Sequence, residues 1–286
     1  MTRTIDGIGK LADRYDAFVF DMWGCLHDGI RAFPGVADML ERLGQRGRQR
    51  IVLSNAPRLV GPLRTQMPSF GLDPDAFEGI VTSGEDAWQA LAADDHKLGR
   101  RFLHIGSPLN IGDPTAIGFA QVDELADADF ILATGPAGDG TIDMTAFGPM
   151  LAAARKREMA LICANPDLEV MRGDKRYLCA GTLARSYEEL GGRTIYHGKP
   201  HAGVYRRALA MAGNVPKSRV LALGDAMRTD IAGARQAGID SVFIPGGIHA
   251  EHLLPVGATL PSADDMNALA QAHGFAPTYL LDELRW

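Results

Sequence analysis

The sequence is poor in cysteine, with only Cys25, Cys163 and Cys179 among 286 residues. Thiols that are so few and so widely spaced exclude a disulfide framework and a four-thiolate zinc site. Each cysteine is therefore predicted to be a small apolar side chain in a reducing compartment, and the expected location is the cytoplasm.

Long hydrophobic runs and an excess of positive charge are also lacking. No apolar run reaches the roughly 18–20 residues that a membrane span needs, and residues 1–16 are too polar for a secretion signal. Lys and Arg number 29 against 35 Asp and Glu, so the net charge is −6. A nucleic-acid-binding face needs clustered basic residues, and no basic stripe is present. We therefore predict no membrane partner and no nucleic-acid partner.

What the sequence does contain is a regular alternation of short apolar runs and amphipathic stretches. Runs without polar alternation are typical of buried parallel strands, and helical patterns lie between them. The predicted strands are 17–20, 51–53, 130–133, 160–163, 220–223 and 242–244, and the clearest predicted helices are 34–44, 202–211 and 229–236. This order predicts an α/β fold with a doubly wound parallel sheet, whose ligands bind at the carboxyl ends of the strands.

Polar residues stand where three of these strands end. Asp21 follows the first strand, Ser54 and Asn55 follow the second, and Asp225 follows a late one. Each residue alone is also explained as a helix cap. Their joint occurrence predicts a site at one edge of the sheet.

The middle of the chain has its own alternation of strands and helices. About 100 residues are enough for an independent small domain. We therefore predict a core formed by residues 1–87 and 196–286, interrupted by an inserted α/β cap domain at residues 88–195.

Four segments, taken in order, resemble the motifs of the haloacid dehalogenase superfamily. They are Phe18–Gly29, Ser54-Asn55, Gly198-Lys199-Pro200, and the stretch from Gly224-Asp225 to Thr229-Asp230. Val81–Gly84 and Asn165-Pro166-Asp167 resemble its NagD-like branch (subclass IIA). The resemblance implies a Rossmann-like core with a cap, and a phosphatase for a small organic phosphate such as a sugar phosphate or a nucleotide. Related capped proteins often pair, so a homodimer is compatible with it.

The chemistry of the residues agrees with this resemblance. A carboxylate with an ordinary pKa of ~3.9 is ionised at neutral pH, so Asp21 can act as a nucleophile without a base. Asp21 and Asp225 end parallel strands and can converge on one hard cation such as Mg²⁺. Lys199 would neutralise the transferring phosphoryl group and Ser54 would hydrogen-bond to it.

The resemblance implies further site residues. The backbone carbonyl of Trp23 would be another metal ligand, and Asp230 would hold metal-bound water or orient Lys199. Asn55, Asn165 and Asp167 are expected to face the substrate, although the last two are equally well explained as a turn. Lys199 as a solvated loop residue and Asp230 as a first-turn helix acid are the simpler alternatives.

Trp23 departs from the pattern of the family. Most phosphatases of this superfamily carry a second Asp at that position, which protonates the leaving oxygen, and an indole cannot do so. General acid–base catalysis typically raises the reaction rate by roughly 10²–10⁴-fold. Two alternatives to a phosphatase follow: a phosphometabolite-binding protein with little or no turnover, and a dehalogenase that uses the same Asp21 ester chemistry.

His27 is the predicted substitute proton donor. Its ordinary pKa of ~6.5 suits proton transfer near neutrality, and we expect Asp28 beside it to raise that value. The alternatives are that His27 packs under the cap, or that the leaving group is acidic enough to depart unaided. His249 and His252 are spaced like a metal-binding pair, but histidines in a loop are more often surface residues.

Overall fold

The strand β2 (Ala17–Phe20) lies in the interior of a parallel sheet of seven strands. The computed structural model describes residues 2–135, 144–172, 175–247, 253–254 and 257–286. His249 and His252 lie outside the described residues. The strand order is β1 (Arg3–Thr4), β14 (Tyr279–Leu280), β13 (Asp240–Phe243), β12 (Val220–Gly224), β2, β3 (Gln49–Ser54) and β4 (Gly79–Thr82).

Helices cover both faces of this sheet, as the all-apolar strands require. Phe18 and Phe20 of β2 point into the cluster beneath α1 (Val36–Gln45) and α2 (Val60–Gln66). Ala17 and Val19 point to the opposite face and meet α6 (Ala202–Met211) and α7 (Ala232–Ala237). Successive side chains of a strand alternate between faces, so a short apolar run supplies both cores.

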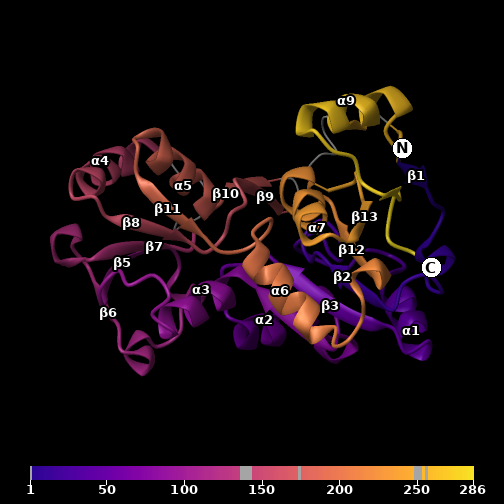
Figure 1. Cartoon of the computed structure of the whole chain (residues 1–286), viewed down its shortest axis with the longest axis horizontal. Coiled ribbons are helices and arrows are strands. Elements are labelled where there is room, and N and C mark those ends of the chain that lie inside the picture. Colours follow the sequence, from indigo (N-terminus) through magenta and orange to yellow (C-terminus); the bar gives the residue numbers. More distant parts are fainter. Residues whose placement is uncertain (1, 136–143, 173–174, 248–252, 255–256) are drawn as a thin grey trace.

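A second parallel sheet is formed by the middle of the chain (Figure 1). Its strand order is β11 (Arg193–Tyr196), β8 (Ala160–Cys163), β7 (Phe130–Ala133), β5 (Arg101–Ile105) and β6 (Ala120–Val122). Residues of α4 (Gly148–Lys156) and α5 (Ala180–Glu189) pack on one face. Ala87 and Leu91 of α3 (Ser83–Ala92) pack on the other.

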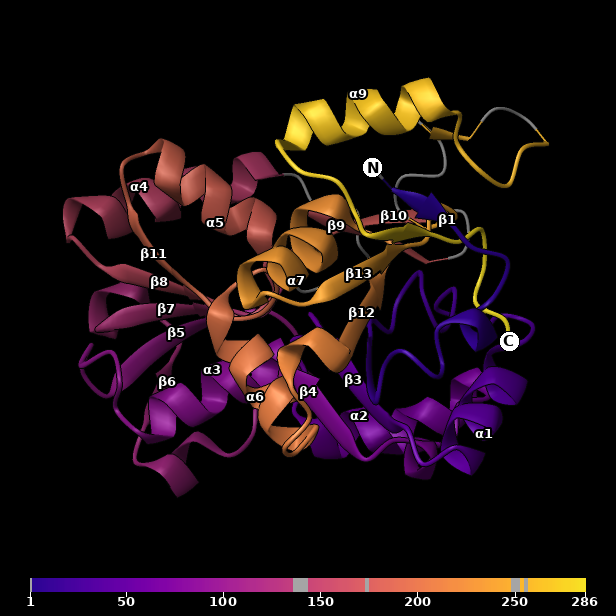
Figure 2. The same cartoon turned by 45° about the vertical axis from the view of Figure 1, so that its right-hand side comes forward.

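Smaller elements complete the described chain. The antiparallel pair β9 (Glu169–Arg172) and β10 (Lys175–Leu178) extends from the second sheet towards the first, and α9 (Ala263–His273) lies beside the first sheet (Figure 2). Single 3₁₀ turns occupy Ile8–Lys10, Met67–Phe70, Pro74–Ala76, Pro108–Asn110, Pro114–Ile117, Leu125–Asp127, Met144–Phe147 and Lys217–Arg219. Within the described ranges, no helix is both long and apolar enough for a membrane span.

The predicted α/β fold with parallel sheets is confirmed, and each predicted strand is present within about two residues of its expected ends. The helix predicted over 229–236 is instead a π-helical turn, Met227–Ile231, followed by α7. Both predicted domain boundaries fall inside regular elements, one within α3 and the other within β11. The division into a core and a cap at those positions stays a prediction.

Candidate active site

The strand ends of the first sheet bring together side chains that are distant in the sequence. β2 lies between β12 and β3, so Asp21, Ser54 and Asp225 leave neighbouring strands at the same edge. The backbone N–H of Asp21 donates to the carbonyl of Leu223 over 2.8 Å, which fixes the first strand against β12. After β2 the chain adds β3 and β4 on one side, and later β12 and β13 on the other side. An open parallel sheet forms a ligand-binding crevice at the point where the strand order reverses in this way.

Three carboxylates gather in this crevice. Asp21, Asp225 and Asp230 each offer an oxygen, and these oxygens lie within 4.8 Å of one another. The three side chains are buried, with exposed fractions of 8%, 6% and 4%. The π-helical turn carries Asp230 back towards the end of β12, where its carboxylate accepts the backbone N–H of Ala226 over 3.1 Å.

Glycines permit this close packing of carboxylates. A Cβ built on Gly24 would lie 2.3 Å from Oδ2 of Asp225, and one on Gly247 would lie 1.8 Å from the same atom. A Cβ on Gly224 would lie 2.2 Å from Cγ of Asp230. Real side chains never approach so closely, so these positions require glycine for the carboxylates to stay in place.

Lys199 provides a positive charge inside the cluster. Its ammonium donates to Oδ1 of Asp21 and, over 2.7 Å, to Oδ1 of Asp230. Burial alone would lower the pKa of Lys199, but the carboxylates of Asp21 and Asp230 outweigh it and hold that pKa well above the ordinary value. Lys199 is therefore charged at neutral pH and is not a solvated loop residue.

The donor set fits a divalent cation. Burial, followed by the charge of Asp230, raises the pKa of Asp21 well above its usual value, even though Lys199 opposes that shift. A cation bound among the three carboxylates would favour the charged form of Asp21. Hard oxygen donors gathered in this way are the ligands that Mg²⁺ or Ca²⁺ prefers.

Asn55 connects the site to the second sheet. Its Oδ1 accepts the backbone N–H of Lys199 over 2.7 Å, and its Nδ2 donates to the carbonyl of Lys199 over 3.3 Å. The same Nδ2 donates to Oδ1 of Asp167 over 2.9 Å. The Asn55 amide thus holds the backbone of Lys199, while Ser54 keeps its hydroxyl at the end of β3 and accepts the N–H of Ala56 over 3.1 Å.

Asn165 and Asp167 lie where the second sheet meets the first. Oδ1 of Asn165 accepts the backbone N–H of Asp167 over 3.1 Å, which forms the turn that the sequence allowed. Arg228, in the π-helical turn, donates to the carbonyl of Pro166 over 2.8 Å and ties this loop to the first sheet. Burial raises the pKa of Asp167.

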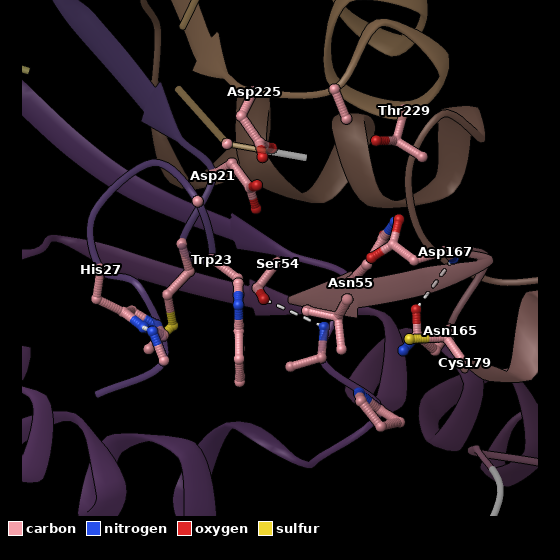
Figure 3. Close-up of a pocket in the computed structure, with 18 of the residues that line it drawn as sticks. Asp21, Trp23, His27, Ser54, Asn55, Asn165, Asp167, Cys179, Asp225 and Thr229 are labelled. Atoms are coloured by element: carbon pink, nitrogen blue, oxygen red, sulfur yellow. Dashed lines mark hydrogen bonds between the residues drawn. The ribbon is translucent and has the colours of Figure 1, made fainter. Parts of the chain in front are cut away.

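One cavity of about 550 Å³ between the two sheets is lined by Asp21, Ser54, Asn55, Asn165, Asp167, Lys199 and Asp225. Asp230 and Arg228 are not part of its lining. Figure 3 shows Asp21 and Asp225 together at one end, with Asn165 and Asp167 on another side. Several lining residues were not predicted from the sequence as site residues, because all of them except Thr229 lie outside the motif segments, several within α2, β9 and β10. They are Phe33, Arg58, Leu63, Gln66, Phe70, Glu169, Val170, Leu178, Cys179 and Thr229.

Comparisons with known proteins agree with this geometry. The chain is 34% identical to a haloacid dehalogenase-like hydrolase from Brucella suis 1330, whose crystal structure matches with a TM-score of 0.81 over 98% of this chain and 99% of that one. The chain belongs to the haloacid dehalogenase-like hydrolases. The family model for haloacid dehalogenase-like hydrolases matches residues 18–118, and a related HAD-hydrolase-like model matches residues 196–285.

Curated relatives place this hydrolase in the NagD-like branch. Ribonucleotide monophosphatase NagD of Escherichia coli K12 is 28% identical over 78% of this chain and 84% of its own length. Human chronophin is 25% identical over 82% of each chain.

Trp23 and His27 pack against each other in the loop that follows Asp21 in this haloacid dehalogenase-like chain. Their ring centroids lie 5.2 Å apart, and the His27 ring stacks on Phe70 at 4.3 Å. Burial lowers the pKa of His27 to about 4, and the opposing effect of Asp28 is too small to reverse it. The expectation that Asp28 would bring this pKa above its ordinary value is therefore wrong, and His27 is neutral at pH 7.

A second cluster of polar side chains in this hydrolase includes His197, which is two residues before Lys199 in the sequence. Nδ1 of His197 is 2.7 Å from Oδ2 of Asp86, and Oδ1 of Asp86 accepts from Nε of Arg207 over 2.6 Å. Nε2 of His197 lies 3.0 Å from Nε2 of His96. The cluster links three parts of the chain. They are α3, which leads into the second sheet, the segment after β11, which returns from that sheet, and α6.

Proposed function

We propose that this chain hydrolyses phosphomonoesters of small organic molecules with the help of Mg²⁺, and that Asp21 is the nucleophile. The observation that carries the proposal is the position of Lys199 between Asp21 and Asp230, beside Asp225, in a cavity at the strand ends. Hydrolysis of phosphate esters also agrees with the names of the relatives, ribonucleotide monophosphatase NagD among them.

Each side chain has a role in this mechanism. The carboxylate of Asp21 attacks phosphorus and the ester oxygen leaves, which gives an aspartyl-phosphate. Water then attacks phosphorus, the bond to Asp21 breaks, and inorganic phosphate is released. Lys199 and the hydroxyl of Ser54 bind the phosphoryl oxygens as charge develops on them.

The cation would be held by Asp21, Asp225 and Asp230, with Asp230 acting directly or through water, and by the backbone carbonyl of Trp23. When bound, it neutralises the carboxylates and the anionic phosphate, so that an anionic nucleophile can approach. Lys199 remains bound to Asp230 and keeps its ammonium at the phosphoryl position.

We further propose that residues 88–195 act as a cap that determines which phosphate ester enters. Support comes from the cavity, whose wall combines the strand ends of the first sheet with Asn165, Asp167 and Leu178 from the second unit. In this proposal Asn55 and Asp167 chiefly position Lys199 and the cap loop, because their polar atoms bond to one another and to the Lys199 backbone. The partner is then a small phosphorylated molecule, and a homodimer is compatible with this arrangement.

The test is the release of inorganic phosphate from a panel of phosphate esters, with Mg²⁺ and then with a chelator. We expect turnover that the chelator abolishes and that added Mg²⁺ restores. Asp21→Asn should remove turnover, because an amide is not a nucleophile of this kind. Asp28→Asn is the matched control, since Asp28 lies on the same loop but its carboxylate accepts the backbone N–H groups of residues 30 and 31. Esters that bind without any hydrolysis would contradict the proposal and favour a phosphometabolite-binding protein.

A further inference from the structure

Trp23 forms part of the cavity wall two residues after the nucleophile. The half-buried indole packs closely over Gly29, where an added Cβ would lie 2.4 Å from Cζ2 of the indole. Figure 3 shows Trp23 beside Ser54, in the same cavity as Asp21. An indole N–H can donate a hydrogen bond, but it does not give up its proton near neutrality. In the proposed mechanism, the position that carries a proton-donating Asp in most phosphatases of this superfamily therefore holds a side chain that cannot supply the proton.

Three other titratable side chains that line the cavity, Asp28, His27 and Asp167, are poorly placed to replace an acid at that position. The carboxylate of Asp28 accepts the backbone N–H groups of Arg31 and Ile30, each over 2.8 Å, and these bonds lower its pKa. His27 is neutral, and its Nδ1 accepts the N–H of Gly29 over 2.8 Å. Asp167 is held by Asn55, and Figure 3 shows it on the far side of Ser54 and Asn55 from Trp23.

Apolar side chains, two of them aromatic, form part of the cavity wall in addition to Trp23, alongside polar ones such as Arg58, Gln66 and Glu169. Phe33, Leu63 and Phe70 come from the first unit, and Val170 and Leu178 come from the second. Such a wall suits a flat, weakly hydrated group, which stacks on an aromatic face with an offset or edge-on geometry.

We propose that this site takes phosphate esters of acidic, planar hydroxyls, namely aryl or enol phosphates, in preference to alkyl phosphates. The inference rests on the proposed function and narrows its substrate class. An oxygen of Asp21 bonds to phosphorus while the ester P–O bond breaks, and the electron pair leaves on the aryl or enol oxygen without a proton. In the second step water attacks phosphorus, its proton passes to solvent, and the carboxylate of Asp21 is regenerated.

The size of the effect follows from the acidity of the leaving group. A phenol such as the tyrosine side chain has a pKa of ~10, whereas an aliphatic alcohol, like water, is a far weaker acid with a much higher pKa. A positioned general acid usually contributes ~10²–10⁴-fold. Without a general acid, the hydrolysis of alkyl phosphates is slowed by this factor. The hydrolysis of esters of acidic hydroxyls is slowed much less, because their leaving oxygen departs readily as an anion.

The experiment measures kcat/KM with Mg²⁺ for a series of substituted phenyl phosphates and for alkyl phosphates such as glycerol 3-phosphate. We expect kcat/KM to fall steeply as the pKa of the leaving hydroxyl rises, and alkyl esters to be slower than p-nitrophenyl phosphate by about 10²-fold or more. Trp23→Asp should raise kcat/KM for alkyl esters by about tenfold or more and change the aryl esters much less. Trp23→Asn is the matched control, because asparagine has the size of aspartate but no carboxylic acid. This variant should not raise kcat/KM for the alkyl esters.

The outcomes separate this inference from the proposed function. Similar kcat/KM values for alkyl and aryl esters in the unmodified protein would mean that a proton donor is present, and would overturn the inference alone. No turnover of any ester would overturn the proposed function and the inference with it. Circular dichroism checks that the variants fold, and the series on the unmodified protein decides the question even where a variant does not.

Discussion

At the residue scale, Asp225 is enclosed by backbone from two loops. A Cβ on Gly24 or Gly247 would lie within 2.3 Å of its carboxylate oxygen, so the surrounding chain is shaped around this side chain. Asp225 also lies beside Asp21 and Asp230, whose oxygens are within 4.8 Å of its own. A carboxylate so enclosed has few degrees of freedom and is suited to hold a cation directly.

We therefore predict that Asp225→Asn weakens Mg²⁺ binding by about tenfold or more, because the amide removes a full charge from the ligand set. Isothermal titration calorimetry of Mg²⁺ against the variant measures the change, and Asp28→Asn is the control. The circular dichroism spectrum should stay unchanged. An unaltered Mg²⁺ affinity would remove Asp225 from the ligand set.

A second residue-scale prediction concerns the pH dependence of stability. Burial lowers the pKa of His104, on β5, to about 4, while Nε2 lies 2.8 Å from Oγ1 of Thr134. The unfolded chain has an ordinary histidine pKa of ~6.5, so between these values it binds more protons than the folded chain. The free energy of unfolding should thus fall as the pH is lowered from about 6.5 to about 4.

Urea denaturation at several pH values measures this effect. His104→Gln cannot titrate but keeps a group that can bond to Thr134, so its free energy of unfolding should fall less steeply with decreasing pH. His273 is a suitable control, because it ends α9 and does not belong to the second sheet. Equal slopes for the unmodified protein and His104→Gln would show that His104 is protonated as readily in the folded state.

At the scale of elements, the cluster around Asp86 ties together the chain segments that pass between the two sheets. Asp86 comes from α3, His197 follows β11, and Arg207 comes from α6. His197 is two residues before Lys199, so any shift of its ring displaces the backbone that carries the Lys199 ammonium. The cluster is therefore expected to position Lys199 without touching the substrate.

We predict that Asp86→Ala lowers the free energy of unfolding by about 2–4 kcal/mol, because it leaves His197 without its buried partner. The kcat for phosphate ester hydrolysis should fall with it, because Lys199 is less well held. Arg207→Gln is the matched control, since the Arg207 side chain is 39% exposed and such partners contribute less than about 1 kcal/mol. Urea denaturation and steady-state kinetics measure both effects, and equal losses in the two variants would contradict the assignment.

This cluster also shows what the sequence could not predict. Asp86 and His197 are 111 residues apart, and neither stands at the end of a predicted strand, so no local pattern connects them. Asp21, Ser54 and Asp225 were predictable because each directly follows a buried strand of a parallel sheet. The pKa of His27 was predicted in the wrong direction, because its neighbour Asp28 is visible in the sequence and its burial against Phe70 is not.

At the scale of the whole molecule, the alternation of strands and helices predicted the α/β class, and the sheets themselves needed the structure. The apolar runs of β2 and β7 look alike in sequence, yet they lie in different sheets. Which sheet a strand joins depends on packing across its faces, such as Phe18 beneath α1 and Phe130 beneath α3. The apolar pattern indicates that a strand is buried, but it does not indicate which elements cover the strand.

The hydrogen bonds that connect the two units lie beside the cavity. Asn55 holds Lys199 on one side and Asp167 on the other, and Arg228 holds the carbonyl of Pro166. A ligand that occupies the phosphoryl position should draw these groups together, because it bonds to the elements that they connect. Loop segments that close over a ligand are protected from exchange with solvent.

We therefore predict that Mg²⁺ with orthovanadate, a phosphoryl mimic, slows amide hydrogen exchange in residues 54–58 and also in residues 165–170 of the second unit. In Asn55→Ala the first segment should still gain protection, while the second should gain much less, because the bond to Asp167 is lost. Residues 101–105 of β5 do not line the cavity and serve as the internal control, since their exchange should not change. Protection confined to residues 54–58 in the unmodified protein would show that the second unit does not respond to the phosphoryl group, and it would contradict the role of residues 88–195 as a cap.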